Sequence, residues 1–292
     1  MNVFHRGELT VQGRSGQEII AEKVGRTIHT TVPDAAAGFL AEQPMIVIAG
    51  ADRAGRLWVT RLTGPPGFIR VLDSRTLELE AVPGAGDPLA PPSGPWPLGL
   101  IAIQPDRRRR MRANGTARLA GRCLRITVDQ VYSNCPKYIS RRHIVSTPGW
   151  TPLGSGVHRG IELNARQRAA VGAADAFFVG SADESGRADA SHRGGNPGFL
   201  EVRSSTRLYW PEYPGNSMFM TLGNLALEPH CGLLIPDWAT GGMLQLTGRA
   251  ETAWPAQRGM APAGVEFTVQ EVVEHPSGPL RWTPPELSPV NP

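Results

Sequence analysis

The residues with the clearest capacity for chemistry lie between positions 190 and 224. Residues 190–195 read ASHRGG, and residues 211–229 read PEYPGNSMFMTLGNLALEP. An arginine guanidinium makes paired, charge-assisted hydrogen bonds to phosphate, and free N–H groups at the start of a helix attract anions. We expect Asn216 and Ser217 to lead, as N-cap residues, into a helix over MFMTLGNLAL. The pattern therefore predicts one anion-binding site, formed by His192, Arg193, Asn216, Ser217, Thr221 and Asn224.

Each of these residues also has an ordinary structural explanation. His192 could be a surface histidine at a strand end, and Arg193 could pair with a carboxylate. The asparagines and the serine that follow could simply cap a helix or be solvated. We favour binding because a related segment earlier in the chain lacks nearly all of them.

The chain contains two copies of one module. Residues 49–71 align with residues 180–202 at a constant offset of 131, which pairs Asp52 with Asp183. Further along, the offset grows to 133 and then to 141, as changes in loop length would produce. Glycine and proline shared at fixed spacing mark common backbone requirements. In the first copy, Leu62 stands at the place of Arg193, and a segment rich in Pro and Gly replaces the predicted helix.

Each copy predicts the same series of elements. A short helix is followed by a buried strand, a tight A-D-x-x-G-R turn and a second strand. Six or seven short strands in roughly 110 residues are typical of a small antiparallel barrel. We therefore predict a mainly β protein with a few short helices, built from two tandem barrels. A β-sandwich is the structural alternative.

The repeat also predicts how the chain is divided. We expect an N-terminal extension (1–32), the first copy (33–140), a linker (141–163), the second copy (164–276) and a Pro-rich tail (277–292).

The composition argues against several classes of function. The net charge is +4, but only Lys23 and Lys137 among the 30 basic residues are lysine. Such a bias is typical of a GC-rich genome, so the basic character alone is weak evidence for nucleic-acid binding. The basic run Arg107–Arg110 could grip phosphate, but we favour a solvated turn leading into a strand. No apolar run reaches the ~18 residues of a membrane span. The polar N-terminus has no apolar core of a secretion signal.

The cysteines indicate a reducing compartment. Cys123, Cys135 and Cys231 form no C-x-x-C pair and are odd in number, so we expect no disulfide framework, no metal site and a cytoplasmic location. We expect Cys135 to be a buried small hydrophobic residue, with a redox thiol as the alternative. Lys137 could matter as a lysine or could be a surface replacement.

Three motifs of the second copy resemble the pyridoxamine 5′-phosphate oxidase-like family of flavin-nucleotide-binding split β-barrels. They are SHRGGNPGF (191–199), P-x-x-PGNSxxxTLGN (211–224) and LLIPDWATGGMLQLTGRAE (233–251). In the first copy, VYSNCPKYI (131–139) looks like the NCPKYI segment of the same family. The chain has no run that matches the R-x-V-L-L-K strand or the basic C-terminal substrate motif of true pyridoxamine-phosphate oxidases.

The resemblance implies two split barrels of the FMN-binding type that form a pseudo-dimer, with FMN held non-covalently between them. Ser191, His192 and Arg193 would face the cofactor, and the N–H groups of Gly194 and Gly195 would approach the isoalloxazine edge. The residues that would bind the phosphate or fix the loop and helix beside it are Arg193, Ser217, Thr221, Asn216 and Asn224. The segment with Lys137 and Tyr138 would supply a wall of the site. Deazaflavin and FAD are less favoured cofactors, and His192 is the candidate general base.

Three hypotheses of function follow from the resemblance. The first is a flavin-dependent oxidoreductase that acts on a small molecule or on a nicotinamide cofactor. The second is a flavin-binding protein without turnover, which would serve as a carrier, a sensor or an electron-transfer partner. The third is haem binding on the same type of barrel, with His192, His230 or His143 as the iron ligand. A homodimer, in addition to the pseudo-dimer, is compatible with each of them.

Overall fold

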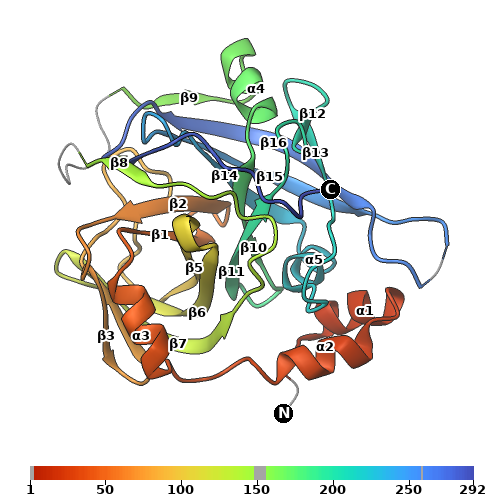
Figure 1. Ribbon diagram of the computed structural model, residues 1–292, viewed down its shortest axis with the longest axis horizontal. Coiled ribbons are helices and arrows are strands. Elements are labelled where there is room, and N and C mark those ends of the chain that lie inside the picture. The colour runs from red at the N-terminus through yellow and green to blue at the C-terminus, as the bar shows by residue number, and fades with distance from the viewer. Residues whose placement is uncertain (1–2, 148–155, 258) are drawn as a thin grey trace.

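The protein consists mainly of antiparallel β-sheet, which confirms the predicted fold class. The computed structural model describes residues 3–147, 156–257 and 259–292. Two large sheets form the body of the molecule, and short helices lie at their ends and edges (Figure 1).

The first copy begins with the predicted short helix, α3 (Asp34–Ala41), and continues as a seven-stranded sheet. Its strands are β1 (Met45–Ala51), β2 (Leu57–Thr63), β3 (Ile69–Asp73), β4 (Thr76–Leu79), β5 (Trp96–Gln104), β6 (Arg109–Ala120) and β7 (Cys123–Ser133). A 3₁₀ turn, η1 (Pro105–Arg107), joins β5 to β6. The strand order is β2-β1-β5-β6-β7-β4-β3.

The second copy repeats this arrangement strand for strand. The helix α4 (Ala165–Gly172) precedes β10 (Ala176–Ala182), β11 (Ala188–Gly194), β12 (Glu201–Val202), β13 (Arg207–Pro211), α5 (Met220–Leu225), β14 (His230–Pro236), β15 (Met243–Ala253) and β16 (Gly264–His275). Their order, β11-β10-β14-β15-β16-β13-β12, matches that of the first copy when each strand is replaced by its counterpart. The repeat read from the sequence is therefore a repeat of structure.

The shared residues of the repeat have the same structural task in both copies. Asp52 Oδ1 accepts hydrogen bonds from the N–H groups of Ala54 and Arg56, and so closes the turn between β1 and β2. Asp183 Oδ1 closes the turn between β10 and β11 in the same way. The register of the ladder shifts at Gly115 in β6 and at Gly248 in β15, which are 133 residues apart.

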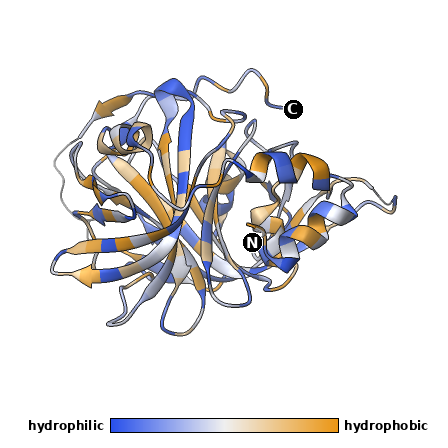
Figure 2. Cartoon of the chain, turned by 90° about the horizontal axis from the view of Figure 1, so that it is seen from below, coloured by the Kyte–Doolittle hydropathy of each residue, from blue (hydrophilic) through white to orange (hydrophobic). Residues whose placement is uncertain are grey.

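The two copies pack against each other through β1, β2 and β5 on one side and β10, β11 and β14 on the other. The apolar core between them includes Met45, Val47, Phe178 and Ala190, and hydrophobic residues run along these central strands (Figure 2). A Cβ atom on Gly99 of β5 would lie 2.3 Å from the Asp189 Cα of β11. Backbone therefore meets backbone at this point.

An equivalent contact lies on the other side of the interface. A Cβ atom on Gly232 of β14, the counterpart of Gly99, would lie 2.8 Å from the carbonyl oxygen of Leu57 in β2. Both contacts require glycine, because no side-chain atom fits between the strands. The paired contacts make the molecule a pseudo-dimer of barrels within one chain.

The substitution Gly99→Ala should loosen this interface. The added methyl group has no space, so we expect a loss of about 1–3 kcal/mol or more in the free energy of unfolding. Denaturant unfolding measures the change. Gly38→Ala in α3 is the control, because a Cβ there meets nothing within 4 Å. Equal stability of the two variants would show that the close strand contact is not required.

Two further helices, α1 (Arg6–Arg14) and α2 (Glu18–Gly25), come from the predicted N-terminal extension. They lie beside α5 (Figure 1), and α1 packs on α5. His5 caps α1: its Nδ1 accepts from the Gly7 N–H, and its own N–H donates to Glu8 Oε2 (2.8 Å). Burial raises the pKa of the Glu8 carboxyl to about 8.

Glu8 should therefore make stability depend on pH. Between pH values near 4.5 and 8 the folded chain keeps a proton on Glu8 that the unfolded chain releases, so stability falls as the pH rises through this window. The fall is on the order of 1 kcal/mol per pH unit. Glu8→Gln keeps an acceptor for the backbone N–H of His5. In urea unfolding between pH 5 and pH 8, this variant should show a flatter slope of unfolding free energy against pH. Glu22→Gln, at an exposed residue of α2, should leave the slope as in the parent.

The segments outside the two copies add small sheets. In the predicted linker, β8 (Ile144–Ser146) pairs with β17 (Arg281–Trp282) of the tail, and β9 (His158–Gly160) pairs with β16. Residues 148–155 of the linker lie outside the described residues. The domain boundaries stay a prediction. Among the described residues, no helix has the length and apolar character to cross a membrane.

Candidate functional site

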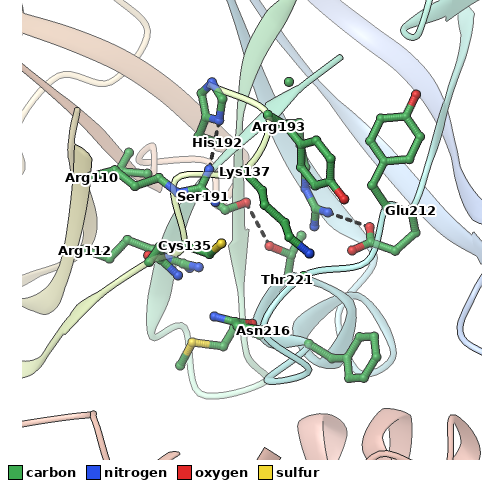
Figure 3. Close-up of a pocket in the computed structure, with 18 of the residues that line it drawn as sticks. Arg110, Arg112, Cys135, Lys137, Ser191, His192, Arg193, Glu212, Asn216 and Thr221 are labelled. Atoms are coloured by element: carbon green, nitrogen blue, oxygen red, sulfur yellow. Dashed lines mark hydrogen bonds and ion pairs between the residues drawn. The ribbon is translucent and has the colours of Figure 1, made fainter. Parts of the chain in front are cut away.

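A cleft lies where the two copies meet, and segments of both copies line it. The first copy contributes β6 and residues 134–138, and the second copy contributes β11 and the segment from the end of β13 to α5 (Figure 3). The enclosed space is about 120 Å³, and the cleft is partly open to solvent. Space of this size suits a phosphate-sized group, and a larger ligand would extend through the open side.

The structure brings most of the predicted site residues to this cleft. Those that line it are Lys137, Tyr138, Ser191, His192, Arg193, Gly194, Asn216, Ser217 and Thr221. Gly195 and Asn224 do not line it. The sequence motifs therefore converge in space, although they come from three separate parts of the chain.

A hydroxyl pair joins β11 to α5. The Oγ of Ser191 and the Oγ1 of Thr221 lie 3.0 Å apart in a buried hydrogen bond (Figure 3). The bond fixes the start of α5 against the strand that carries His192 and Arg193. Both hydroxyls retain acceptor capacity toward the cleft.

The predicted N-cap at Asn216 and Ser217 is wrong. The helix α5 begins only at Met220, after Ser217 (φ 63°) and Phe219 (φ 55°), which both adopt the left-handed conformation. Non-glycine residues rarely occupy this region without support. Asn216 Oδ1 accepts from the Met218 N–H within the loop.

Side chains of the N-terminal helices support this loop. Gln12 Nε2 donates to the Met218 carbonyl oxygen (3.0 Å), and Ser217 Oγ donates to Gln17 Oε1 (2.6 Å). The loop conformation thus depends on residues about 200 positions earlier in the chain. Sequence motifs within the loop give no sign of this support.

Two arginines of β6, which the sequence argument did not select, face the cleft. Arg107 and Arg109 are exposed, but Arg110 is partly buried and Arg112 is buried, and both line the cleft. The prediction of a solvated turn therefore holds only for part of the basic run. The sequence did contain a signal for this. Side chains alternate between the two faces of a strand, so residues 110 and 112 must share one face.

The cleft carries an excess of positive charge. Arg193 pairs with Glu212 (2.5 Å), and Arg112 pairs with Asp189, which lines a neighbouring cavity rather than the cleft. Among the described residues, no carboxylate pairs with Arg110 or with Lys137. Buried N–H groups of three guanidiniums lack an acceptor, namely Nε of Arg110, Arg112 and Arg193.

Arg110 is the most informative of these cations. Burial, and secondly the charge of Arg112, lower its pKa to about 10, so it remains a cation at neutral pH. Its hydrogen bond goes to His192 Nδ1 (3.0 Å; Figure 3). A partly buried cation whose partner is a neutral ring is electrostatically uncompensated, and an anion in the cleft would compensate it.

His192 is a neutral acceptor. Since Arg110 can only donate, Nδ1 holds the lone pair and Nε2 carries the proton. Burial and the charges of Arg110 and Arg193 hold the pKa of His192 well below its usual range. Its ring also packs edge-to-face on Phe178, with centroids 5.5 Å apart. To act as a general base, His192 would first have to release Arg110.

The NCPKYI segment closes one side of the cleft. The Tyr138 hydroxyl donates to the Pro214 carbonyl oxygen (3.0 Å), and its ring lies 5.2 Å from that of Tyr213. Cys135 is exposed at the cleft, so the prediction of a buried residue is wrong. Lys137 is exposed as well.

The two glycines after Arg193 allow other residues of the chain to pack closely against their backbone. A Cβ on Gly194 would lie 1.9 Å from the Tyr138 carbonyl oxygen, and one on Gly195 would meet the ring of Phe199. The Gly195 N–H donates to the Asp175 carbonyl oxygen (3.0 Å), so it is not free for a ligand. The expected approach of Gly195 to a flavin is therefore wrong.

Asn224 has a structural task on the far side of α5. Its amide donates to Ser181 Oγ (3.0 Å), and its Oδ1 accepts from His5 Nε2 (2.9 Å). The side chain is buried, and it lines the neighbouring cavity rather than the cleft. Asn224 instead ties the N-terminal segment to the second copy. The other histidines considered as iron ligands, His143 and His230, also lie outside the cleft.

The pseudo-symmetric counterpart of the cleft lies between β2 of the first copy and β15 of the second copy. Side chains of the protein fill it. Thr60, the counterpart of Ser191, donates to the buried carboxyl group of Asp87. Gln245, the counterpart of Arg112, donates to the Val59 carbonyl oxygen (2.9 Å). Arg61, the counterpart of His192, is buried and donates to the Gly241 carbonyl oxygen. The side chains of Asp87, Gln245 and Arg61 thus fill the place that is open in the cleft.

Comparisons with known proteins give only a weak likeness. No family model and no curated protein matches the chain. HupZ of Group A Streptococcus is 12% identical at a TM-score of 0.32, over 40% of this chain and 98% of its own. HutZ, a heme storage protein of Vibrio cholerae, is 10% identical at 0.28, over 40% and 98%. A proposed 5-nitroimidazole antibiotic resistance protein of Bacteroides thetaiotaomicron is 10% identical at 0.26, over 49% and 96%. Likeness at this level carries no argument about function.

Inorganic phosphate should bind at the cleft and stabilise the folded chain. We expect it to raise the unfolding temperature of the parent, because it would compensate Arg110. Arg110→Gln keeps an N–H donor for His192 but removes the charge, so it should lose most of this effect. Arg107→Gln, at an exposed arginine of the same run, is the matched control. An equal response of both variants to phosphate would place the anion elsewhere.

Proposed function

We propose that the chain is a flavoprotein that binds FMN in this cleft. The observation that carries the proposal is the uncompensated Arg110, in a cleft that also offers Arg112, Arg193 and the Ser191–Thr221 hydroxyl pair. Guanidinium and hydroxyl groups together are the donors that a phosphate monoester requires. The motifs that resemble flavin-binding split barrels supply most of these residues.

The cleft also suits the flat part of a flavin. Tyr138, Tyr213 and Phe219 line it beside the arginines, so aromatic surface adjoins the positive charge. Met220 lines both the cleft and the neighbouring cavity of about 640 Å³. Unfilled space therefore adjoins the narrow part of the cleft that the arginines line. Charge at one end and apolar surface at the other match a phosphate-bearing ring system.

We propose that the function is a flavin-dependent oxidoreduction of a small molecule or a nicotinamide cofactor. The bound flavin would supply the electron chemistry. Arg110 and Arg193 would hold the phosphate, and His192 would orient Arg110 through Nδ1. The NCPKYI segment would exclude water from one side. A cytoplasmic location and an additional homodimer stay predictions.

Flavin binding without turnover is the second candidate. His192 gives the lone pair of Nδ1 to Arg110, so it is not free to accept a proton, and Glu212 is held in an ion pair with Arg193. Such a cleft could serve a carrier or an electron-transfer partner. Bound FMN that neither NADH nor NADPH reduces would favour this candidate over the first.

The absorbance spectrum and the mass of the released ligand test the proposal. The protein purified with its ligand, or incubated with FMN, should show the visible spectrum of an oxidised flavin. Arg193→Gln should weaken FMN binding by about 1–3 kcal/mol, as expected for the loss of a charge-assisted hydrogen bond. Arg207→Gln, at an exposed position of β13, is the control. A colourless protein that takes up no FMN would refute the proposal, and a Soret band would favour haem.

A further inference from the structure

The neighbouring cavity lies where the N-terminal segment meets both copies. It encloses about 640 Å³ between residues 3–8, β6 and β7 of the first copy, and the turn from β10 to β11 and α5 of the second. Among the described residues that line the cavity and the cleft, Met220 alone is common to both. A cavity of this volume is large enough for a small molecule.

Carboxyl groups predominate among the charged residues of this cavity. Arg187 and four acidic residues line it, namely Glu8, Asp129, Asp183 and Asp189. Arg187 pairs with Asp183 (2.7 Å), and Asp189 pairs with Arg112. Among the described residues, no arginine or lysine pairs with Glu8 or with Asp129. The cavity therefore has an excess of acidic groups.

Glu8 presents one oxygen of its carboxyl group to the cavity. Its side chain is only 4% exposed, and Oε2 accepts from the His5 backbone N–H (2.8 Å). Oε1 accepts no hydrogen bond from the described residues. His5 Nε2 lies 3.6 Å from it and donates instead to Asn224 Oδ1 (2.9 Å). Unlike the fully sealed polar atoms of the core, Oε1 keeps accessible surface, so a ligand in the cavity can reach it.

The carboxyl group of Glu8 holds a proton at neutral pH. Burial, together with the charge of Asp189, raises its pKa to about 8. The His5 N–H and the charges of Arg112 and Arg187 act in the opposite direction but do not offset this rise. His5 itself is neutral, because burial lowers its pKa. A cation beside Glu8 would favour the ionised carboxylate and release the proton.

The surroundings of Glu8 suit an organic cation better than a metal ion. Among the described residues, no three side chains of His, Cys, Asp or Glu come together as metal ligands. Val3, Ile28 and Pro97 instead give the cavity apolar surface. One reachable carboxyl oxygen beside apolar walls matches an ammonium group carried on an apolar body.

We propose that the neighbouring cavity binds a small primary ammonium compound with an apolar body, whose N–H group donates to Glu8 Oε1. The apolar body packs against Val3 and Ile28, and the exposed carboxylate of Asp129 adds attraction on the solvent side. On binding, one proton passes from the Glu8 carboxyl group to the buffer. The proposal does not depend on a ligand in the cleft.

Calorimetric titration of the full chain with benzylamine, a cation at neutral pH, tests the proposal. PIPES and ACES buffers differ in their enthalpy of ionisation, so the heats in the two buffers at pH 7 count the protons released. We expect about one proton per ligand. The affinity should rise about tenfold per unit between pH 6 and pH 8, because the ionised fraction of Glu8 rises in this range.

Three variants locate the probe. Glu8→Gln should abolish both the proton release and the pH dependence, and should weaken binding at pH 8 about tenfold, the loss of one charge-assisted hydrogen bond. Asp129→Asn, at an exposed position that the fold does not depend on, should weaken binding by about two- to fivefold. Glu22→Gln is the matched control, because Glu22 is exposed on α2 and does not line the cavity.

Several outcomes would overturn the proposal. A parent chain that does not bind benzylamine has no such site. Proton release that persists in Glu8→Gln would mean that another group titrates. If Glu22→Gln weakens binding as much as Glu8→Gln, the probe senses only the general charge of the surface. If benzyl alcohol, which is neutral, binds as tightly as benzylamine, the ligand is not a cation. Arg110→Gln should bind the probe as the parent does, which separates this test from that of the cleft.

Discussion

The contact of strand backbones across the two copies is the constraint on which the rest of the structure depends. Gly99 lets β5 lie directly against β11, and Gly232 lets β14 lie directly against β2. Because β6 is hydrogen-bonded to β5, this contact also brings β6 beside β11. The guanidinium of Arg110 can then reach the ring of His192. The cleft is therefore a product of the interface, and neither copy contains it alone.

The same interface creates two related places, and side chains decide that only one is open. In the open place, Ser191 bonds to the hydroxyl of Thr221, and Arg112 provides a cation. In the other place, Asp87 accepts from Thr60, and an amide replaces the cation. Burial raises the pKa of the Asp87 carboxyl, and the buried Arg61 of the same place remains a cation at neutral pH. The two places thus differ in the side chains that fill them, on nearly the same backbone.

Features that depend on short stretches of sequence could be predicted. Features that depend on contacts between distant segments of the chain could not. Asp-Gly turns and the shared spacing of glycines follow from backbone conformation, so the repeat and the series of strands along each copy could be anticipated. The start of α5 could not, because Ser217 and Phe219 are held in the left-handed conformation by a loop that Gln12 and Gln17 support from the N-terminal helices. The orientation of β6 was also hidden. Alternation shows that Arg110 and Arg112 share a face, but only the partner copy shows which face is covered.

The pair of Arg110 and His192 indicates how the cleft is prepared for an anion. A partly buried guanidinium without a carboxylate lowers the stability of the fold, and an apolar residue of similar size would be tolerated better. The fold carries this cost at Arg110 in the cleft and also at Arg61 in the related place, whose buried guanidinium donates to the Gly241 carbonyl oxygen. His192 has a lowered pKa and stays neutral, so it accepts from Arg110 without neutralising its charge. A carboxylate at this position would fix the arginine equally well but would cancel the attraction for an anion. The neutral histidine therefore orients Arg110 and leaves its charge available.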